Sequence, residues 1–600
     1  MNKKLEKWIE LYTDARSHRT KIDSLIPIRN NLYNGTGDVT NKTTGQIAKK
    51  KGYCYRNMCF ELIEAQINNA IPFPKVTPRD SKDKALAAQL EDYERLEMDR
   101  MDSETINDAA ERGTLKQGTA FYLVGWNSME NTPVSQGELY IKYYPLEYVY
   151  PQPGITLLED AEYIFTRDLI SIKSAKKLYG KDVPDNGEFK GKQWLVTAWY
   201  LNDDDYLSRF GWIENTEIIL FDDDAYELRR FKVCKDCGEK MYGDKCAVCG
   251  SEKYEYKTET QETLKEDLVL YDPENPKNSQ VVARAGDKLD YYKIKQLPFV
   301  LRKNVSNGET LYGVSDIDVI RNNQESLNKV SAKIEENILK GGSILMVPKG
   351  VNIPNTDETL KRVQIDDVKL AEGIKAVALQ ANTQQDSIFQ ESLYQTGRDT
   401  LGITDSYQGK RDTTAESGKA KQVAAAQSAG RLESKRRMKD AAYADLYKLM
   451  FKFLLAYCDE PRTYTTVDPE GKLHEAKFNR YNFLAQDAAG NLYYNDRFLF
   501  DVDDASTLMT NREALWQETT NKLVSGAFGN PADYRTLSLY WNLMQGLDYP
   551  LAKQTLAYLQ QMTKQLDPAI QQAIMENPQL LETVKQVLTE GEQGNENSKQ

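Results

Sequence analysis

A stretch of about 45 residues, Thr413–Tyr457, constrains the fold most strongly, because it reads as one uninterrupted α-helix. It contains no proline, and Thr413 and Glu416 form a T-x-x-E capping box at its start. Pro461 follows its end and cannot continue a helix. Apolar residues recur along it at helical spacing, at Val423, Leu432, Met438, Ala442, Leu446, Leu449, Met450, Phe453, Leu454 and Tyr457. A straight helix of this length spans roughly 65 Å, which suits a large assembly better than a small enzyme.

Length and charge limit the classes of protein that fit this chain. Its 600 residues exceed what one hydrophobic core supports, so we expect several domains. A net charge of -12 excludes a basic nucleic-acid coat, so any contact with DNA should be local or weak. The sequence shows no secretory signal and no apolar run near the roughly 20 residues that a membrane span needs, and we expect a cytoplasmic protein.

The distribution of helical and strand patterns predicts a helix-rich α+β fold. Helical patterns cover about the first thirty residues and about 81–116, where Gly113 and Gly118 are expected to break the helix. Alternating patterns predict strands between 121 and 233 and again from 463 to 500. Helices are expected after residue 510, and the polar tail 591–600 is expected to be disordered.

Four of the seven cysteines form the most specific local motif. Two C-x2-C pairs, each followed by glycine, are separated by eight residues, and they comprise Cys234, Cys237, Cys246 and Cys249. Such pairs aim two thiolates at one point, and two pairs complete a tetrahedral four-thiolate zinc site. The flanking strand-like segments predict a zinc ribbon over 228–257. A four-thiolate site has no open ligand position, so we interpret this zinc, one per chain, as structural rather than catalytic.

Signatures of catalysis are missing from the sequence. No phosphate-binding G-x-x-x-x-G-K-[ST] loop is present, and Gly313-Val314-Ser315-Asp316-Ile317 lacks the closing glycine of a nucleophile elbow. Only two histidines, His18 and His474, are available for acid–base chemistry. We therefore expect that the chain is not an enzyme.

The order of elements before the long helix is the most informative pattern for function. A capped helix (315–340) precedes a small β-containing module (343–381), a second helix (384–401) and a polar loop (404–412). The two helices can lie side by side and carry the module away from the body. The segment 405–440 contains nine basic and five acidic residues, a local excess of four positive charges in an acidic chain. This excess fits contact with phosphates or a neighbouring subunit, or a solvated face with pairs such as Glu433 and Arg437.

This order closely resembles the portal, or head–tail connector, proteins of tailed bacteriophages. The resemblance covers nearly the whole chain. It is strongest from Pro298-Phe299 through Tyr312-Gly313-Val314-Ser315 to Asn323-Gln324-Glu325-Ser326-Leu327-Asn328, and in Thr413-Thr414-Ala415-Glu416-Ser417-Gly418-Lys419-Ala420. These matches are patterns, less specific than a catalytic signature. The family forms a ring, usually of twelve subunits, around a DNA channel.

The resemblance implies a division of the chain into the regions of a portal subunit. The wing would comprise 1–300, with the zinc ribbon (228–257) as an insertion that departs from the minimal family pattern, and 461–505. The stem would comprise 301–340 and 384–403, the clip 341–383, the tunnel loop 404–412, the long helix 413–460 and the helical crown 506–590. Side chains expected in the channel loop are Tyr407, Gln408, Lys410 and Arg411. Residues expected to contact DNA or a neighbouring subunit are Lys419, Lys421, Arg431, Lys435 and Arg436.

The resemblance also implies a function and a set of partners. The ring would sit at one vertex of a viral capsid, assemble in the host cytoplasm and pass double-stranded DNA during packaging and ejection. Its partners would be the large terminase subunit, the head–tail adaptor, the major capsid protein and the scaffold, with no membrane. A conduit must let DNA slide, and weak contact from a few cations suits this because each neutralised phosphate adds affinity.

Two other functions fit parts of the sequence. The first is a zinc-ribbon nucleic-acid enzyme or regulator that dimerises through the long helix as a coiled coil. Lys435 and Arg436 interrupt the apolar stripe that such a coiled coil requires. The second is a scaffold or adaptor without a channel.

Overall fold

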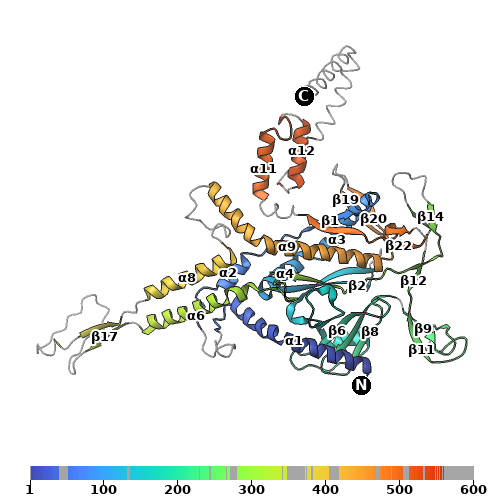
Figure 1. Cartoon of the computed structure of the whole chain (residues 1–600), viewed down its shortest axis with the longest axis horizontal. Coiled ribbons are helices and arrows are strands. Elements are labelled where there is room, and N and C mark those ends of the chain that lie inside the picture. Colours follow the sequence, from blue (N-terminus) through green and yellow to red (C-terminus); the bar gives the residue numbers. More distant parts are fainter. Residues whose placement is uncertain are drawn as a thin grey trace, which may run out of the picture. The chain divides into compact units, whose positions relative to one another are not determined.

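The computed structural model describes most of the chain in two compact units, Met1–Val502 and Asp503–Gln600. The described residues are 2–39, 52–131, 136–228, 230–241, 245–264, 267–270, 280–340, 342–346, 372, 375–379, 383–403, 418–467, 473–487, 490–503, 512–531, 534–546, 549, 552, 555–556 and 559. Helices and strands are mixed throughout the first unit (Figure 1), which confirms the expected α+β class.

The helices follow the boundaries expected from the sequence closely in several places. The longer ones are α1 (Lys3–Tyr33), α2 (Met58–Glu64), α3 (Lys84–Arg100), α4 (Ser103–Gln117), α5 (Ile172–Tyr179), α6 (Asp316–Lys340), α8 (Gln384–Leu401), α9 (Gly418–Tyr457), α11 (Arg512–Val524) and α12 (Tyr534–Gly546). The long helix is confirmed as α9 from residue 418 onward. Its expected start at Thr413 lies outside the described residues.

The strands form several small antiparallel sheets. In the first half of the chain they are β1 (Phe73–Pro78), β2 (Thr119–Asn131), β3 (Gln136–Pro145), β4 (Val149–Pro151), β5 (Tyr163–Ser171), β6 (Lys192–Leu201), β7 (Leu207–Ile213), β8 (Ile219–Asp223), β9 (Arg230–Cys234), β10 (Lys240–Met241), β11 (Tyr254–Thr258), β12 (Gln261–Thr263), β13 (Leu268–Leu270), β14 (Gln280–Ala283) and β15 (Lys288–Asp290). The later strands are β16 (Phe299–Lys303), β17 (Gly342–Met346), β18 (Lys375–Leu379), β19 (Arg462–Val467), β20 (Leu473–Phe478), β21 (Leu484–Gln486), β22 (Leu492–Tyr494) and β23 (Phe498–Asp503).

The largest sheet has five strands in sequential order, β4-β5-β6-β7-β8, and α1 packs on one of its faces. Trp8 of α1 meets the ring of Phe165 edge-on, and Tyr12 meets the rings of Phe165 and Trp212 in the same way. Phe165 and Trp212 also meet each other edge-on. Such aromatic pairs add to the stabilisation from buried area alone. This packing explains how part of the tyrosine- and tryptophan-rich composition is used, because these rings fill the space between one helix and one sheet.

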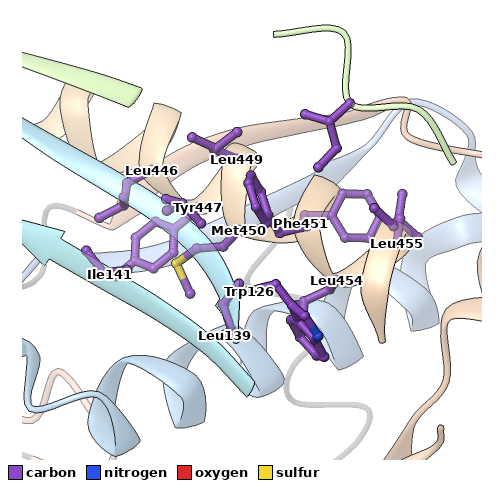
Figure 2. Packing of buried hydrophobic residues seen from close by; sticks show 14 of the residues in the cluster. Trp126, Leu139, Ile141, Leu446, Tyr447, Leu449, Met450, Phe451, Leu454 and Leu455 are labelled. Carbon is purple, nitrogen blue, oxygen red and sulfur yellow. The ribbon is translucent and has the colours of Figure 1, made fainter. Parts of the chain in front are cut away.

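The C-terminal half of α9 is the centre of the main hydrophobic core (Figure 2). It packs beside a three-stranded sheet, β16-β2-β3, where Trp126, Leu139 and Ile141 contribute side chains. Leu446, Leu449, Met450, Phe451, Phe453, Leu454 and Leu455 are all at most 1% exposed. From Leu446 to Ala456 only Lys448 is exposed, and a helix that is apolar around most of its circumference is buried on most sides. This part of α9 is therefore a core helix of its own chain rather than a one-faced amphipathic rod.

The helix expected over 81–116 is divided elsewhere than predicted. The break lies at Met101 and Asp102, where Asp102 adopts a left-handed backbone (φ 51°), and not at Gly113. Gly113 lies inside α4. The position needs a glycine because a Cβ there would stand 1.9 Å from the hydroxyl of Tyr143. The glycine permits close packing and does not end the helix. Gly118 does end α4, in the left-handed conformation typical of helix C-termini.

A second core forms where α6 and α8 join the body of the unit. It contains Met58, Leu62 and Ile63 of α2, Ile317 and Ile320 of α6, and Tyr394 and Leu401 of α8, with Ile28 and Leu32 of α1 and Leu115 of α4. The helices α6 and α8 lie side by side beyond it (Figure 1), and the antiparallel strands β17 and β18 lie between them in chain order. The pairing of two helices around a β-containing module is thus as expected.

The second unit is described mainly through α11 and α12. Tyr540, Met544 and Ala552 form its small core, with Trp516, Leu523, Phe528 and Trp541 packed against them. The hydroxyls of Thr520 and Tyr540 lie 3.0 Å apart and link the two helices. The remaining helices expected in 506–590 fall on residues outside the described ranges, apart from short pieces near 552–559. Across the described residues, no helix combines the length and the apolar character that crossing a bilayer requires.

One buried carboxyl in the main unit has no hydrogen-bond partner among the described residues. Glu94 of α3 is 0% exposed, and neither of its oxygens is paired. Burial, with a smaller contribution from Glu91, raises the pKa of Glu94 well above its usual value. The folded protein therefore keeps this proton in a pH range where the unfolded chain has released it. Stability should consequently fall as pH rises above the ordinary carboxyl pKa.

The substitution Glu94→Gln is expected to stabilise the protein at pH 7, since it mimics the protonated carboxyl. A gain on the order of 1–3 kcal/mol is expected, and it should shrink as pH is lowered toward about 3, where wild-type Glu94 is neutral in both states. Denaturant unfolding at several pH values measures this difference. Glu433→Gln, at a partly exposed helix position, is the control. A gain that is independent of pH would contradict the assignment.

Candidate functional site

The four clustered cysteines lie in a small three-stranded ribbon. Strand β9 runs antiparallel to both β10 and β11, in the order β10-β9-β11. Cys234 ends β9, so the first cysteine pair follows directly from a strand, as the flanking patterns predicted. The second pair lies in the connection that leads to β11. The ribbon expected over 228–257 is therefore present in the described part of that range.

The two cysteine pairs adopt the same backbone arrangement. The N–H of Gly238 donates to the carbonyl of Cys234, and the N–H of Gly250 donates to that of Cys246, both at 2.9 Å. Both glycines have positive φ, 76° and 70°, which L-residues rarely adopt. This conformation folds the chain back after each pair. It explains why a glycine follows each C-x2-C motif, although a Cβ there would meet no neighbour.

The four sulfur atoms are close enough to bind a metal ion. All four lie within 4.8 Å of one another, with Cys234 Sγ 3.3 Å from Cys249 Sγ and Cys237 Sγ 3.4 Å from Cys246 Sγ. A tetrahedral zinc with Zn–S bonds of about 2.3 Å needs sulfurs about 3.8 Å apart, so the cluster fits with small adjustments. The donor set consists of thiolates only, which zinc accepts readily.

Backbone donors favour the thiolate form of Cys234 and Cys246, the two buried cysteines of the cluster. Burial would raise the pKa of Cys234, but the N–H groups of Cys237 and Asp236 outweigh it and bring this pKa to about 6. The N–H groups of Cys249 and Val248 similarly lower the pKa of Cys246. The N–H of Glu239 would lower the pKa of Cys237, but contacts with the neighbouring thiols raise it to about 12, and the pKa of Cys249 also rises. The backbone donors therefore assist two of the four deprotonations that metal binding requires.

Most of the side chains expected to line a DNA channel fall outside the described residues. This applies to Tyr407, Gln408, Lys410 and Arg411 of the polar loop. Lys419, Lys421 and Arg431 lie on α9 by their backbone, but their side chains are also outside the described part. Their expected roles remain predictions.

Lys435, expected to contact DNA or a neighbouring subunit, is instead occupied within its own chain. Its ammonium donates to both carboxylate oxygens of Asp316, at 2.8 and 2.6 Å, and to Oε1 of Gln66 at 2.8 Å. The side chain of Asp316 is only 3% exposed, and it also accepts from Asn304 and Gln66. Removing Lys435 from this site would leave a buried charge without its cation. The expectation for Lys435 is therefore corrected: it anchors α9 to the first residue of α6.

The neighbouring arginines remain on the surface of α9. The Arg436 side chain is 30% exposed and lies 3.8 and 3.9 Å from carboxylate oxygens of Glu433 and Asp440. Arg437 is 79% exposed and donates to Glu433 at 3.2 Å. The pairing of Glu433 with Arg437 was one of the readings left open by the sequence, and it is confirmed. The contact of Arg436 with DNA or a neighbouring subunit stays a prediction.

The paired helices α6 and α8 are held together by polar contacts along their length. Asn323 donates to the carbonyl of Leu393 at 3.3 Å, Gln390 donates to the hydroxyl of Ser331 at 2.8 Å, and Lys333 pairs with Asp386 at 3.1 Å. Several large apolar side chains of the same two helices face outward. Val319, Ile338, Leu339, Ile388 and Phe389 are exposed, Leu339 by 77% and Phe389 by 52%.

A buried charged cluster beside α9 was missed at the sequence level. Lys439, Glu111 and Arg302 are each at most 5% exposed, and the two cations share the Glu111 carboxylate at 3.2 and 2.6 Å. Burial lowers the pKa of Lys439 to about 8, although Glu111 acts in the opposite direction. These residues come from α9, α4 and β16, so only the fold brings them together. Nothing in their local sequence signals the cluster.

A cleft of about 630 Å³ opens where the ribbon joins the main unit. Residues on both sides of the ribbon line it, including Glu227 before it and Glu262 after it. Its carboxylates are largely neutralised by arginines: Arg209 pairs with Asp223 and Glu227, and Arg480 pairs with Glu262 and Asp459. The paired charges stabilise the root of the ribbon.

The search of protein-family models and the search of curated proteins both end without a match to this chain.

Proposed function

We propose that this chain is the subunit of a viral portal, a ring of about twelve copies at one capsid vertex through which double-stranded DNA is packaged and ejected. The observation that carries the proposal is the helix pair α6 and α8, with the antiparallel strands β17 and β18 between them in chain order and the long helix α9 after them. This arrangement corresponds to a stem, a clip and the helix that leads from the channel into the wing. The role is structural, with no catalytic step.

The outward-facing apolar residues of the helix pair support self-association. Ile338, Leu339, Ile388 and Phe389 are between 52% and 77% exposed. Clusters of large exposed apolar side chains typically mark protein–protein contacts. Ring subunits contact their neighbours through two different faces, and closure of the ring buries both faces on every copy. Side-by-side stems would cover these four side chains.

The burial of α9 argues against a regulator that dimerises through this helix. From Leu446 to Ala456 its apolar side chains lie within the core of the same chain. A coiled coil needs an a/d seam free to meet a partner. Between Leu446 and Ala456, within the described part of α9, no such seam is free to meet a partner.

In the proposed ring the cysteine ribbon is a structural module of the wing that holds one zinc ion per chain. The four thiolates of Cys234, Cys237, Cys246 and Cys249 would fill its coordination sphere, which leaves no position for catalysis. The remaining partners in this proposal are the terminase large subunit, the head–tail adaptor, the major capsid protein and the scaffold. The site of action is the virion.

Contact with DNA is proposed to be weak and independent of sequence, through cations of the loop 404–412. Replacing Lys410 and Arg411 with alanine is expected to impair DNA packaging or retention while leaving ring assembly intact. Loss of a few phosphate contacts lowers affinity and salt dependence without touching the subunit interface. Packaged DNA per particle and ring formation of the purified variant are the measurements. Failure of the rings to form would assign these residues to the interface instead.

Electron microscopy of the purified chain tests the proposal itself. End-on views are expected to show closed rings with a central opening wide enough for a DNA duplex. Compact particles without an opening would contradict a conduit and favour a scaffold or adaptor.

A further inference from the structure

The segment Ile67–Pro72 runs along α9 without belonging to a helix or a strand, and we call it the strap. It connects α2, in the core at the base of α6 and α8, with β1, in the main core. Asn69 is exposed, Ile67, Asn68, Ala70 and Ile71 are half-buried, and Pro72 is buried. Ile67 packs against the core at the base of α6 and α8, and Ile71 packs against the main core. Apolar burial therefore holds the two ends of the strap but contributes little to its middle, Asn68–Ala70.

Side chains of other elements hold the strap through its carbonyl groups. Lys439 donates to the carbonyl of Asn68 at 2.7 Å and to that of Ala70 at 2.8 Å. The Tyr447 hydroxyl donates to the carbonyl of Pro72 at 2.8 Å. Asn107 of α4 donates to the carbonyl of Asn69 at 3.2 Å and itself accepts from the Tyr443 hydroxyl.

The α9 residues in these contacts form a single row. Lys435, Lys439, Tyr443 and Tyr447 are spaced by four, so they lie on one face of the helix. Lys435 meets Gln66 just before the strap, Lys439 meets its middle, and Tyr447 meets Pro72 at its end. Tyr443 reaches the strap only through Asn107. Twelve residues of α-helix rise about 18 Å, and six residues of extended chain span about 20 Å. The strap and the row therefore match in length and direction.

The row is also tied to the start of α6. Asp316, the first residue of α6, accepts from both Lys435 and Gln66. The strap, α9 and α6 thus share one hydrogen-bonded junction. Lys439 faces Glu111 of α4 and Arg302 of β16, with Asp440 and Tyr443 of α9 close by, while the strap itself contributes no titratable group.

We propose that the strap is a latch that opens and closes on the polar row of α9 while both cores stay folded, and that Asp316 links its state to α6. A segment whose middle is held by side-chain hydrogen bonds and not by apolar burial belongs to the least stable part of a fold. The two lysines would be the closing contacts, and α6 would be the element that senses or drives opening. The latch would act within one subunit, whatever assembly the chain forms.

Native-state proteolysis of the full chain with thermolysin, which cleaves before isoleucine and alanine, tests the latch. Ile67 and Ala70 place two cleavage sites in the strap, whereas Pro72 blocks cleavage before Ile71. In the wild type, strap cleavage is expected to be faster than cleavage within either core and to depend only weakly on denaturant, since local opening exposes little surface. Strap cleavage that occurs only together with cleavage of the cores would overturn the proposal.

Variants separate the latch from general loss of stability. Lys439→Met is expected to raise strap cleavage about tenfold or more, because two bonds from a charged donor are lost. Lys448→Met, at an exposed position of the same helix, should leave it unchanged. Tyr447→Phe, which removes one hydroxyl, should raise the rate of strap cleavage several-fold. This variant replaces Lys439→Met as the test if Lys439→Met does not fold. Unchanged cleavage in both Lys439→Met and Tyr447→Phe would overturn the latch.

The link to α6 has its own matched pair. Asp316→Asn is expected to raise strap cleavage several-fold, since it removes the anion shared by Lys435 and Gln66. Asp318→Asn, two residues along the same helix, removes the partner of Arg29 instead and should leave strap cleavage unchanged. Equal effects of the two substitutions would overturn the link.

Discussion

Replacing Cys234 and Cys246 with serine is expected to reduce bound zinc from one ion per chain to none. These two residues are the buried pair of the cluster, and each supplies one of the four thiolates that lie within 4.8 Å of one another. A small ribbon of three short strands has little core of its own, so its folding should depend on the metal. Metal analysis of the freshly purified protein measures the loss directly.

The same substitution is expected to unfold the ribbon without unfolding the main core. Protease sensitivity should rise between residues 230 and 258, while the core around α9 keeps its melting temperature. Cys54→Ser, at a half-buried cysteine outside the cluster, is the control and should retain one zinc ion. A wild-type protein without zinc, or a double variant that keeps it, would contradict a four-thiolate site.

Substituting Leu339 or Phe389 with aspartate is expected to convert rings into folded monomers. Both side chains are more than half exposed in the single chain, so its fold should tolerate the change. In a ring each would be covered by a neighbour. Losing one such contact costs about 2 kcal/mol per interface, roughly thirtyfold in affinity, and a carboxylate buried without a partner adds to this cost. The loss recurs at every interface of the ring.

Size-exclusion chromatography with light scattering distinguishes these outcomes. Leu178→Asp, which replaces an equally exposed apolar residue on α5, is the matched control and should still form rings. If the stem variants assemble as well as the wild type, the α6–α8 surface is not the interface. Loss of helical circular dichroism in the variants would instead indicate a folding defect.

The sequence predicted those features that depend on local pattern. The boundaries of α8 and the C-terminal end of α9 follow from periodicity and from the prolines and glycines beside them. The cysteine ribbon follows from spacing, because two residues between thiols fix a tight turn. The helix pair around a β-containing module follows from the order of patterns along the chain.

Features that depend on distant neighbours were not predictable in this way. Lys435 was expected to contact DNA or a neighbouring subunit, because its partner Asp316 is 119 residues away in sequence. Lys439 gave no sign of burial beside Glu111 and Arg302. Gly113 was misread because the close approach of Tyr143, which requires a glycine, is a tertiary contact. In each case packing between elements decided the role of the residue.

Native mass spectrometry of the purified wild-type chain tests the central claim most directly. A closed ring of portal type is expected to give a mass near twelve times 68.6 kDa. The mass should hold over a wide range of protein concentration, because a closed ring loses two interfaces when one subunit leaves. A stable dimer at all concentrations would contradict the portal account.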